Sequence, residues 1–190
     1  MIETATLGGG CFWCIEAALQ QLDGVRSAVS GYCGGALSHP DYRTVCSGES
    51  GHIEVVQFAF ENERIDYRTL LLAFFSIHDP TSRDRQGDDI GSQYRSVIFT
   101  HGDNQAKTAM ALIAELDTAG HWPTPIVTEV LPAPTFWAAE DYHQDYYANN
   151  RQQPYCRVVV APKLDKVRNA FAERLKGKGA PPQTGLSIST

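Results

Sequence analysis

Gly8-Gly9-Gly10-Cys11-Phe12-Trp13-Cys14 is the stretch around which this 190-residue chain is organised. Three consecutive glycines permit positive φ angles and allow another molecule to approach the backbone closely. Two thiols follow, separated by two large aromatic side chains. Reactive cysteines occur in such partly shielded settings, so we interpret the stretch as a candidate reactive-cysteine site.

The residues on either side of this stretch predict a strand, a glycine turn and a helix. Residues 2–7 have a weak strand pattern, and apolar residues recur at helical spacing from Cys14 until Gly24. Cys11 would then lie at or just before the N-terminus of the helix, where free N–H groups and the helix dipole favour a thiolate. We therefore expect its pKa to lie below the ordinary value of about 8.5. A buried structural pair of cysteines is the alternative interpretation.

The clearest strand covers residues 53–60, and its alternation puts Glu54 on the same face as Val56, Phe58 and Phe60. If that face is turned to the core, loss of solvent raises the pKa of Glu54 and leaves a protonated carboxyl able to donate a proton near neutral pH. A strand-end glutamate in water fits the same pattern equally well.

The rest of the chain alternates further strands with helices. Strands are predicted at residues 25–32, 95–100, 126–131 and 157–160. Helices are predicted at 70–78, 104–118, 137–148 and from Pro162 to about 175, and turn or loop at 38–42 and 83–91. In the helix at 104–118, Asp103 is the expected N-cap. Its expected buried stripe is Ala106, Met110, Ile113 and Ala114.

These elements predict one domain of α/β or α+β class, a two-layer sandwich of a mixed sheet with flanking helices over residues 1–177. Residues 178–190 are rich in Gly, Pro, Ser and Thr and predict a flexible C-terminal tail. The net charge of −6 and the lack of a dense basic run argue against nucleic-acid or membrane partners. Five cysteines, an odd number, with no secretion signal predict a cytoplasmic protein with reduced thiols.

Several chemistries can use a Cys-x-x-Cys pair. A zinc site needs about four ligands, and no second pair follows at suitable spacing. The His52-x-Glu54 pattern lacks the downstream Pro-Cys-x-x-Cys of zinc deaminases. A papain-like pairing of Cys11 with His143 is a minor alternative, because the flanking residues do not match. A glutaredoxin-like thiol-disulfide oxidoreductase fits the two thiols but gives Glu54 no role.

Several segments, in order, resemble the peptide methionine sulfoxide reductase A family. They are Gly10-Cys11-Phe12-Trp13-Cys14, Gly31-Tyr32-Cys33-Gly34-Gly35, Pro40-Asp41-Tyr42 with Val45-Cys46-Ser47-Gly48, Gly51-His52-Ile53-Glu54-Val55-Val56, Asp89-Ile90-Gly91-Ser92-Gln93-Tyr94-Arg95-Ser96 and Ala139-Glu140-Asp141-Tyr142-His143-Gln144. The resemblance implies reduction of the S epimer of methionine sulfoxide, free or in oxidised proteins. It also implies a monomer without cofactor or metal that thioredoxin, or dithiothreitol in its place, reduces.

The resemblance also implies roles for individual residues. Cys11 matches the nucleophile that attacks the sulfoxide sulfur, while Glu54, Tyr42 and Tyr94 match the groups that hydrogen-bond and protonate the sulfoxide oxygen. A sulfoxide oxygen is a poor leaving group until it is protonated, so a thiolate needs an acid opposite it. This favours the core-side interpretation of Glu54.

Substrate binding is implied for three further residues. Phe12 and Trp13 match the pocket for the terminal methyl group of the substrate, an apolar task that suits aromatic rings. Asp89 matches a residue near the site that binds substrate through its backbone amide.

The resolving cysteine departs from a common family pattern. Many members carry it in a glycine-rich C-terminal segment, but residues 157–190 contain no cysteine. Cys14 is the natural substitute, because a short-loop disulfide with Cys11 is sterically familiar in a Cys-x-x-Cys. The competing candidates, which we interpret as small buried apolar residues, are Cys33, Cys46 and Cys156.

Overall fold

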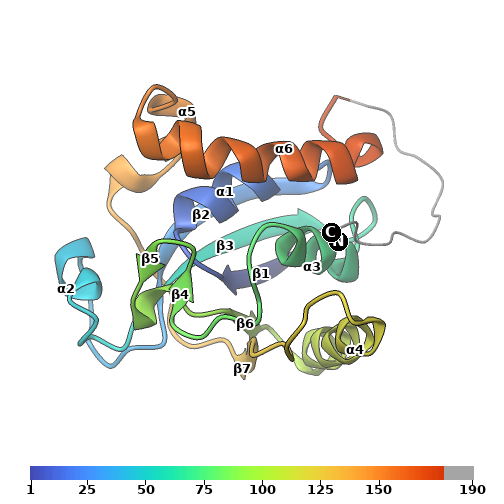
Figure 1. Ribbon diagram of the computed structural model, residues 1–190, viewed down its shortest axis with the longest axis horizontal. Helices are drawn as coiled ribbons and strands as arrows, with labels where there is room; N and C mark the ends of the chain where they lie inside the picture. The colour runs from blue at the N-terminus through green and yellow to red at the C-terminus, as the bar shows by residue number, and fades with distance from the viewer. Residues whose placement is uncertain (178–190) are drawn as a thin grey trace.

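A six-stranded mixed sheet forms the centre of the computed structural model, which describes residues 1–177 (Figure 1). The strand order is β7-β6-β1-β3-β2-β8, and all neighbours are antiparallel except β6 and β7. The strands are β1 (Ile2–Gly8), β2 (Val25–Cys33), β3 (Ile53–Glu61), β6 (Val97–Thr100), β7 (Glu129–Pro132) and β8 (Trp137–Ala138). The predicted tail, residues 178–190, lies outside the described residues.

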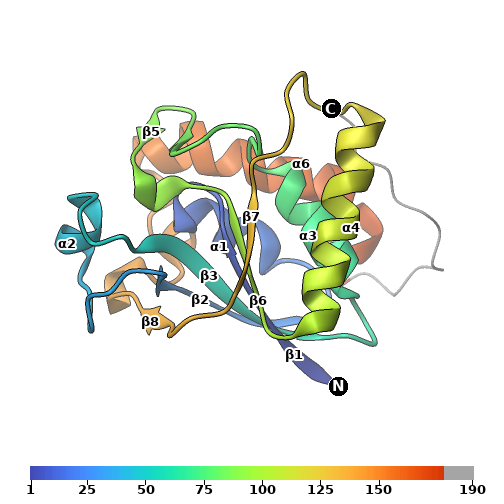
Figure 2. The ribbon, with the colours of Figure 1, turned by 90° about the horizontal axis from the view of Figure 1, so that it is seen from below.

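The longer helices are α1 (Phe12–Leu19), α3 (Tyr67–Ser76), α4 (Asp103–Ala119) and α6 (Ala161–Ala170). Figures 1 and 2 show α1 and α6 packed together above the sheet, with α4 beside β6 and β7. The smaller elements are α2 (Tyr42–Cys46), α5 (Tyr146–Asn149), the β4–β5 hairpin (Arg85–Gln86 and Asp89–Ile90), 3₁₀ turns at Ser92–Tyr94, Asp141–His143 and Ala172–Arg174, and a π-helical turn at Cys156–Val160. The predicted mixed sheet with flanking helices is confirmed.

Alternation along β3 sorts its side chains between the two faces of the sheet. Val56, Phe58 and Phe60 join the main core, to which all four longer helices contribute. Ile53 and Val55 join a small second cluster on the opposite face. This division follows from the period of two in a strand, and it turns Glu54 toward the helical layer, as its predicted face requires.

The predicted continuous helix at residues 137–148 is wrong, and only its end, in α5, is α-helical. Trp137–Ala138 instead forms the edge strand β8, paired with Gly31 and Tyr32. Gly31 permits this pairing, because a Cβ there would lie 2.4 Å from the carbonyl oxygen of Trp137. The side chain of Gln144 then bonds both backbone groups of Ser30, each at 2.9 Å, which keeps the following segment against β2.

The predicted strand at residues 157–160 is also wrong. Cys156–Val160 forms a π-helical turn that runs directly into α6. Cys156 and Val160 are buried four residues apart, a helical spacing, whereas Val158 between them is 73% exposed. A short apolar run is compatible with either structure, and here the packing surface beside α1 selects the helix.

Four local predictions also need correction. Residues 85–90 form a short hairpin rather than a loop, and Tyr42 is the first residue of α2, whose N-cap Asp41 accepts a 2.7 Å hydrogen bond from the Thr44 N–H. The N-cap of α4 is Gly102 rather than Asp103. The buried face of α4 is Gln105, Ala109, Leu112 and Leu116, because packing selects the stripe with the larger leucine side chains over the predicted one.

Within residues 1–177, the structure contains no helix with the length and apolar character that a bilayer span requires.

The corrected face of α4 generates a stability prediction. Leu112 is 1% exposed and Met110 is 54% exposed. Leu112→Ala should lower the free energy of unfolding by about 2–5 kcal/mol, because it leaves a cavity in the core. Met110→Ala, the matched control on the same helix, should change it by about 0.5 kcal/mol or less. Urea denaturation measures both, and equal losses would contradict the assigned face.

Candidate active site

The glycine turn between β1 and α1 is shaped by contacts within the chain. Gly10 has a φ of +94°, and its N–H donates to the carbonyl of Tyr94 at 3.1 Å. A Cβ at Gly8 would lie 2.9 Å from the carbonyl oxygen of Glu54, and one at Gly9 would lie 2.9 Å from the His78 ring. The close approach that we predicted for another molecule is therefore made by this chain itself.

Cys11 is the N-cap residue of α1, as predicted, and Cys14 lies in its first turn. The Cys14 N–H donates to the Cys11 carbonyl at 3.1 Å, and the two thiols also hydrogen-bond through their side chains. Cys11 is 7% exposed and Cys14 is 1% exposed. Both are free thiols, so the structure represents the reduced protein.

The predicted lowering of the Cys11 pKa is wrong in this structure. Burial raises the pKa of the Cys11 thiol well above its ordinary value, and the hydrogen bond with Cys14 and the nearby Glu54 add to the rise. Loss of solvent therefore outweighs the helix N-terminus. The hydrogen bond from Cys11 lowers the pKa of Cys14, and the positive charge of Lys163 acts in the same direction.

Glu54 is only 1% exposed and lies beside the start of α1. Burial raises its pKa to about 8, while the Phe12 N–H, which donates to Oε2 at 3.0 Å, partly opposes this rise. The carboxyl therefore remains largely protonated at neutral pH. This confirms the core-side interpretation and excludes a strand-end glutamate in water.

Tyr42 and Tyr94 share the surroundings of Glu54. Burial raises the pKa of both phenols, and the charge of Glu54 contributes to each rise. Both hydroxyl groups therefore keep their protons and can donate hydrogen bonds. Tyr42 also hydrogen-bonds to Cys46, which is exposed, so our interpretation of Cys46 as buried is wrong.

The other two spare cysteines, Cys33 and Cys156, are buried as expected. Cys33 belongs to the small cluster on the far face of the sheet. Cys156 belongs to the main core, and the influence of Cys14 on its pKa places it in the neighbourhood of the Cys11 and Cys14 pair.

Tyr155 connects Asp89 to the two thiols and was missed by the sequence analysis. Its hydroxyl donates to Asp89 Oδ2 at 2.6 Å and lies close enough to Cys11 and Cys14 to lower the pKa of each thiol slightly. The Asp89 side chain is thus held by Tyr155, while its backbone pairs with Gln86 in the β4–β5 hairpin. Tyr155 precedes a cysteine in an otherwise unremarkable stretch, so no sequence pattern marks it.

An aromatic cluster borders the thiols. The Trp13 ring stacks on Tyr146 with centroids 3.6 Å apart and meets the Tyr155 ring edge-on at 5.8 Å. Trp13 is partly exposed, whereas Phe12 is fully buried against Tyr32. Phe12 therefore packs between the cluster and the core, and Trp13 is the member of the pair whose ring solvent or substrate can reach.

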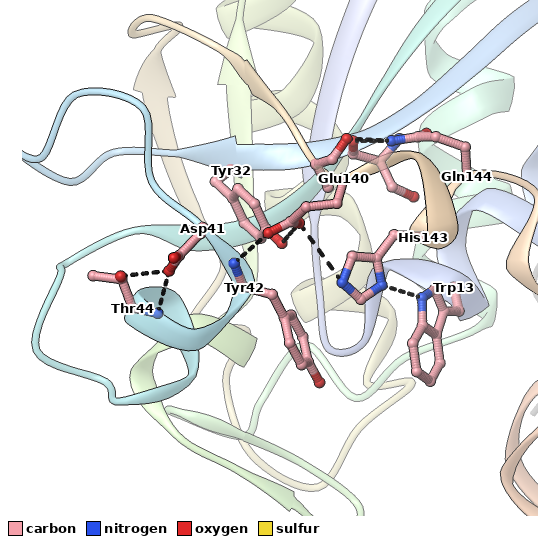
Figure 3. Close-up of polar contacts among 10 residues, drawn as sticks. Trp13, Tyr32, Asp41, Tyr42, Thr44, Glu140, His143 and Gln144 are labelled. Carbon is pink, nitrogen blue, oxygen red and sulfur yellow. Dashed lines mark hydrogen bonds and ion pairs between the residues drawn. The ribbon is translucent and has the colours of Figure 1, made fainter.

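A network of polar contacts holds Trp13 of this cluster in place (Figure 3). The Trp13 indole N–H donates to His143 Nδ1 at 3.1 Å. Glu140 accepts from the Tyr32 hydroxyl at 2.9 Å and from the Tyr42 N–H at 2.7 Å, and one of its oxygens lies 3.7 Å from His143 Nε2.

His143 works in this network as a neutral ring. Burial lowers its pKa, and because Nδ1 accepts the indole hydrogen bond, the ring proton is assigned to Nε2, facing Glu140. His143 thereby connects the position of Trp13 to that of Tyr42. The sequence predicts no role for Glu140 and considers His143 only as a papain-like partner of Cys11. In the fold, His143 is instead bonded to Trp13 and faces Glu140.

Taken together, the site contains a buried thiol pair, a protonated carboxyl and two phenol donors. Over residues 1–177 the structure has no group of three or more His, Cys, Asp or Glu side chains arranged to hold a metal ion. The geometry suits nucleophilic attack by sulfur on a substrate whose oxygen accepts a proton.

Comparisons with known proteins agree with this chemistry. The family model described as peptide methionine sulfoxide reductase matches residues 3–175. The peptide methionine sulfoxide reductase MsrA of Chromobacterium violaceum is 55% identical over 175 residues, which are 92% of this chain and 99% of the relative.

Solved structures of Mxr1 from Saccharomyces cerevisiae are also similar. The reduced form has a TM-score of 0.76 at 34% identity and covers 82% of this chain and 89% of Mxr1. Mxr1 in complex with Trx2 has a TM-score of 0.55 at 26% identity, covering 76% of this chain and 84% of Mxr1.

The raised pKa of Glu54 can be measured directly. The infrared difference spectrum between the wild type and Glu54→Gln should contain the C=O stretch of a protonated carboxyl at pH 6. The band should lose half its intensity near pH 8, because burial disfavours the ionised form. A carboxylate signal at pH 6 would contradict the assigned protonation.

Proposed function

Because this chain belongs to the peptide methionine sulfoxide reductase family, we propose that it is an oxidoreductase that reduces the S epimer of methionine sulfoxide, free or in oxidised proteins, through Cys11. One observation carries the proposal: the buried, protonated carboxyl of Glu54 lies beside the buried Cys11 thiol. A nucleophile and a proton donor are thus held together in a site from which water is largely excluded.

The first step forms a bond between the Cys11 sulfur and the sulfoxide sulfur. Glu54 gives its proton to the sulfoxide oxygen, while Tyr42 and Tyr94 donate hydrogen bonds to it, and the Cys11 proton replaces the one lost by Glu54. The oxygen then passes to Cys11, so that methionine leaves and Cys11 becomes a sulfenic acid. The raised pKa of Cys11 is consistent with this order, since the thiol keeps its proton until a substrate can receive one.

Recognition of the substrate methyl group is assigned to the aromatic cluster. The partly exposed Trp13 ring, stacked on Tyr146 and bonded to His143, offers a rigid apolar surface. Phe12 supports that surface from the core. The Asp89 backbone amide is proposed to bind the substrate close by, while its side chain is held by Tyr155.

The second step is proposed to be attack of the Cys14 thiol on the sulfenic acid, which forms a Cys11–Cys14 disulfide and releases water. The side-chain hydrogen bond between the two thiols and the lowered pKa of Cys14 support this choice. Cys33 lies on the far face of the sheet. Cys156 is the stronger competitor, because it lies near Cys14 in the main core.

Thioredoxin is the proposed reductant of that disulfide, and dithiothreitol can replace it in vitro. The crystal structure of the yeast relative with Trx2 supports this assignment by similarity. Two electrons pass from the thioredoxin dithiol to the disulfide, which restores both thiols. A reducing compartment such as the cytoplasm is the proposed setting.

A glutaredoxin-like thiol-disulfide oxidoreductase remains the second candidate. The Cys-x-x-Cys at a helix start favours it. It assigns no task to the protonated Glu54 or to the two phenols around it, which is why we prefer sulfoxide reduction.

Cysteine variants test which thiol is the nucleophile and which is the resolving cysteine. Cys11→Ser should abolish even a single turnover, since no nucleophile remains. Cys14→Ser should keep the first sulfoxide reduction and lose recycling by thioredoxin, and exposed Cys46→Ser is the matched control that should keep both. After one equivalent of methionine sulfoxide, mass spectrometry of the wild type should find a Cys11–Cys14 disulfide. A link from Cys11 to Cys156, or normal recycling by Cys14→Ser, would assign the resolving role elsewhere.

A further inference from the structure

Glu16 is a buried carboxyl that the proposed mechanism does not use. It lies on α1, one helical turn after Phe12, and is only 1% exposed. Among the described residues, neither of its oxygens completes a hydrogen bond. Burial raises the pKa of Glu16 to about 7. Burying a carboxyl without a hydrogen-bond partner costs free energy of folding, so its presence in the core calls for an explanation.

Two segments face this carboxyl. From β2 it faces the hydroxyl of Ser30, which is itself buried and without a hydrogen-bond partner in the described chain. From the turn before α5 it faces the backbone N–H groups of Asp145 and Tyr146, which favour the ionised carboxylate and so oppose part of the rise in pKa. Asp145 adopts a left-handed φ of +50°, so this turn is not intrinsically favoured and depends on its surroundings.

The same turn carries one wall of the aromatic cluster. Tyr146 stacks on Trp13 with an interplanar angle of 6°, and Gln144 anchors the turn to the backbone of Ser30. Trp13 and Glu16 are three residues apart on α1 and therefore project from the same side of the helix. Glu16 thus lies beneath the turn that presses Tyr146 against Trp13.

We propose that Glu16 is a positioning residue that sets how firmly the turn at residues 144–146 holds Tyr146 against Trp13, and thereby how well the aromatic cluster receives the methyl group of the substrate. The importance of this for catalysis rests on the proposed function of the cluster. The influence of Glu16 on the turn is independent of that proposed function.

Proton linkage gives the direction of the effect. The pKa of Glu16 is about 7 with the turn in place, because burial outweighs the lowering by Ser30 and by the N–H groups of Asp145 and Tyr146. The turn is proposed to supply much of this burial, so that the pKa falls toward the ordinary value of 4.5 when the turn moves away and water reaches the carboxyl. The protonated form therefore favours the docked turn, most strongly below pH 4.5. Docking weakens by up to about tenfold per pH unit as the pH rises toward 7, and then levels off. At neutral pH the turn is held less firmly than in acid.

The other ionisable groups near Glu16 act in distinguishable ways. Asp145, in the docked turn, repels the Glu16 carboxylate and so adds to the preference for the protonated form. Lys163 of α6 acts on the pKa of Cys14, on another side of α1. His143 bonds to Trp13, but its lowered pKa means that it gains a proton only in acid, below its ordinary value of 6.5. A variant at Glu16 therefore isolates the contribution of this carboxyl to the pH dependence of the turn.

Glu16→Gln provides the test, because the amide keeps the shape and stays neutral. The fluorescence of Trp13, obtained by subtracting the spectrum of Trp13→Phe, should change between pH 5 and 7 in the wild type and stay flat over that range in Glu16→Gln. The range stops below pH 8, where the neighbouring Glu54 ionises. At pH 8 the variant should have a KM for methionine sulfoxide several-fold lower than the wild type, with kcat within about twofold. The exposed Glu49→Gln, a matched control, should behave as wild type.

A second variant keeps the proposal testable if Glu16→Gln does not fold. Ser30→Ala removes a hydroxyl that lowers the Glu16 pKa, so the midpoint of the fluorescence change should move to higher pH. A persistent change in Glu16→Gln, an unmoved midpoint in Ser30→Ala or an unaltered KM would each overturn the proposal. The fluorescence needs no turnover, so it decides the role of Glu16 even if methionine sulfoxide proves not to be the substrate.

Discussion

The site depends on the burial of one carboxyl group, that of Glu54. An ionised carboxylate is costly to remove from water, so a glutamate on the core face of a strand keeps its proton up to about pH 8. The Phe12 N–H donates to Glu54 and fixes the orientation of the carboxyl beside Cys11. A proton donor that functions at neutral pH thus follows from the packing around Glu54.

The fold supplies this arrangement by bringing distant segments against the start of α1. The glycine turn fits between the Glu54 carbonyl and the His78 ring, which leaves no room for side chains at Gly8 and Gly9. Behind the turn, the Glu140 and His143 network joins α1 to α2 and to the segment after β8. The reacting groups thus rest on rigid elements, while the aromatic wall at residues 144–146 rests on a strained turn.

The patterns around the two site segments, residues 2–19 and 53–60, were the most predictive. Alternation along residues 53–60 placed Glu54 on the face of Val56, Phe58 and Phe60 but left its burial open, and only the family resemblance favoured the core side. The glycine-to-helix transition correctly placed Cys11 at a helix start. The pKa of Cys11 was mispredicted, because the effect of a helix terminus is local whereas burial depends on the whole fold. Residues 137–148 and 157–160 were misassigned because pairing at the sheet edge and packing on α1 outweighed their local preferences. Tyr155 and Glu16 carry no local signal, since their surroundings come largely from distant segments: the Cys11 and Cys14 pair for Tyr155, and the turn at residues 144–146 for Glu16.

The pairing of Cys11 with a protonated Glu54 is tested most directly by incubating the protein with dithiothreitol and racemic methionine sulfoxide and resolving the epimers by chiral chromatography. The wild type should consume half of the racemate and leave the R epimer. Glu54→Gln, which keeps the shape but cannot give up a proton, should be slower by roughly 10²–10⁴-fold. Consumption of neither epimer, or an undiminished rate in the variant, would contradict the account.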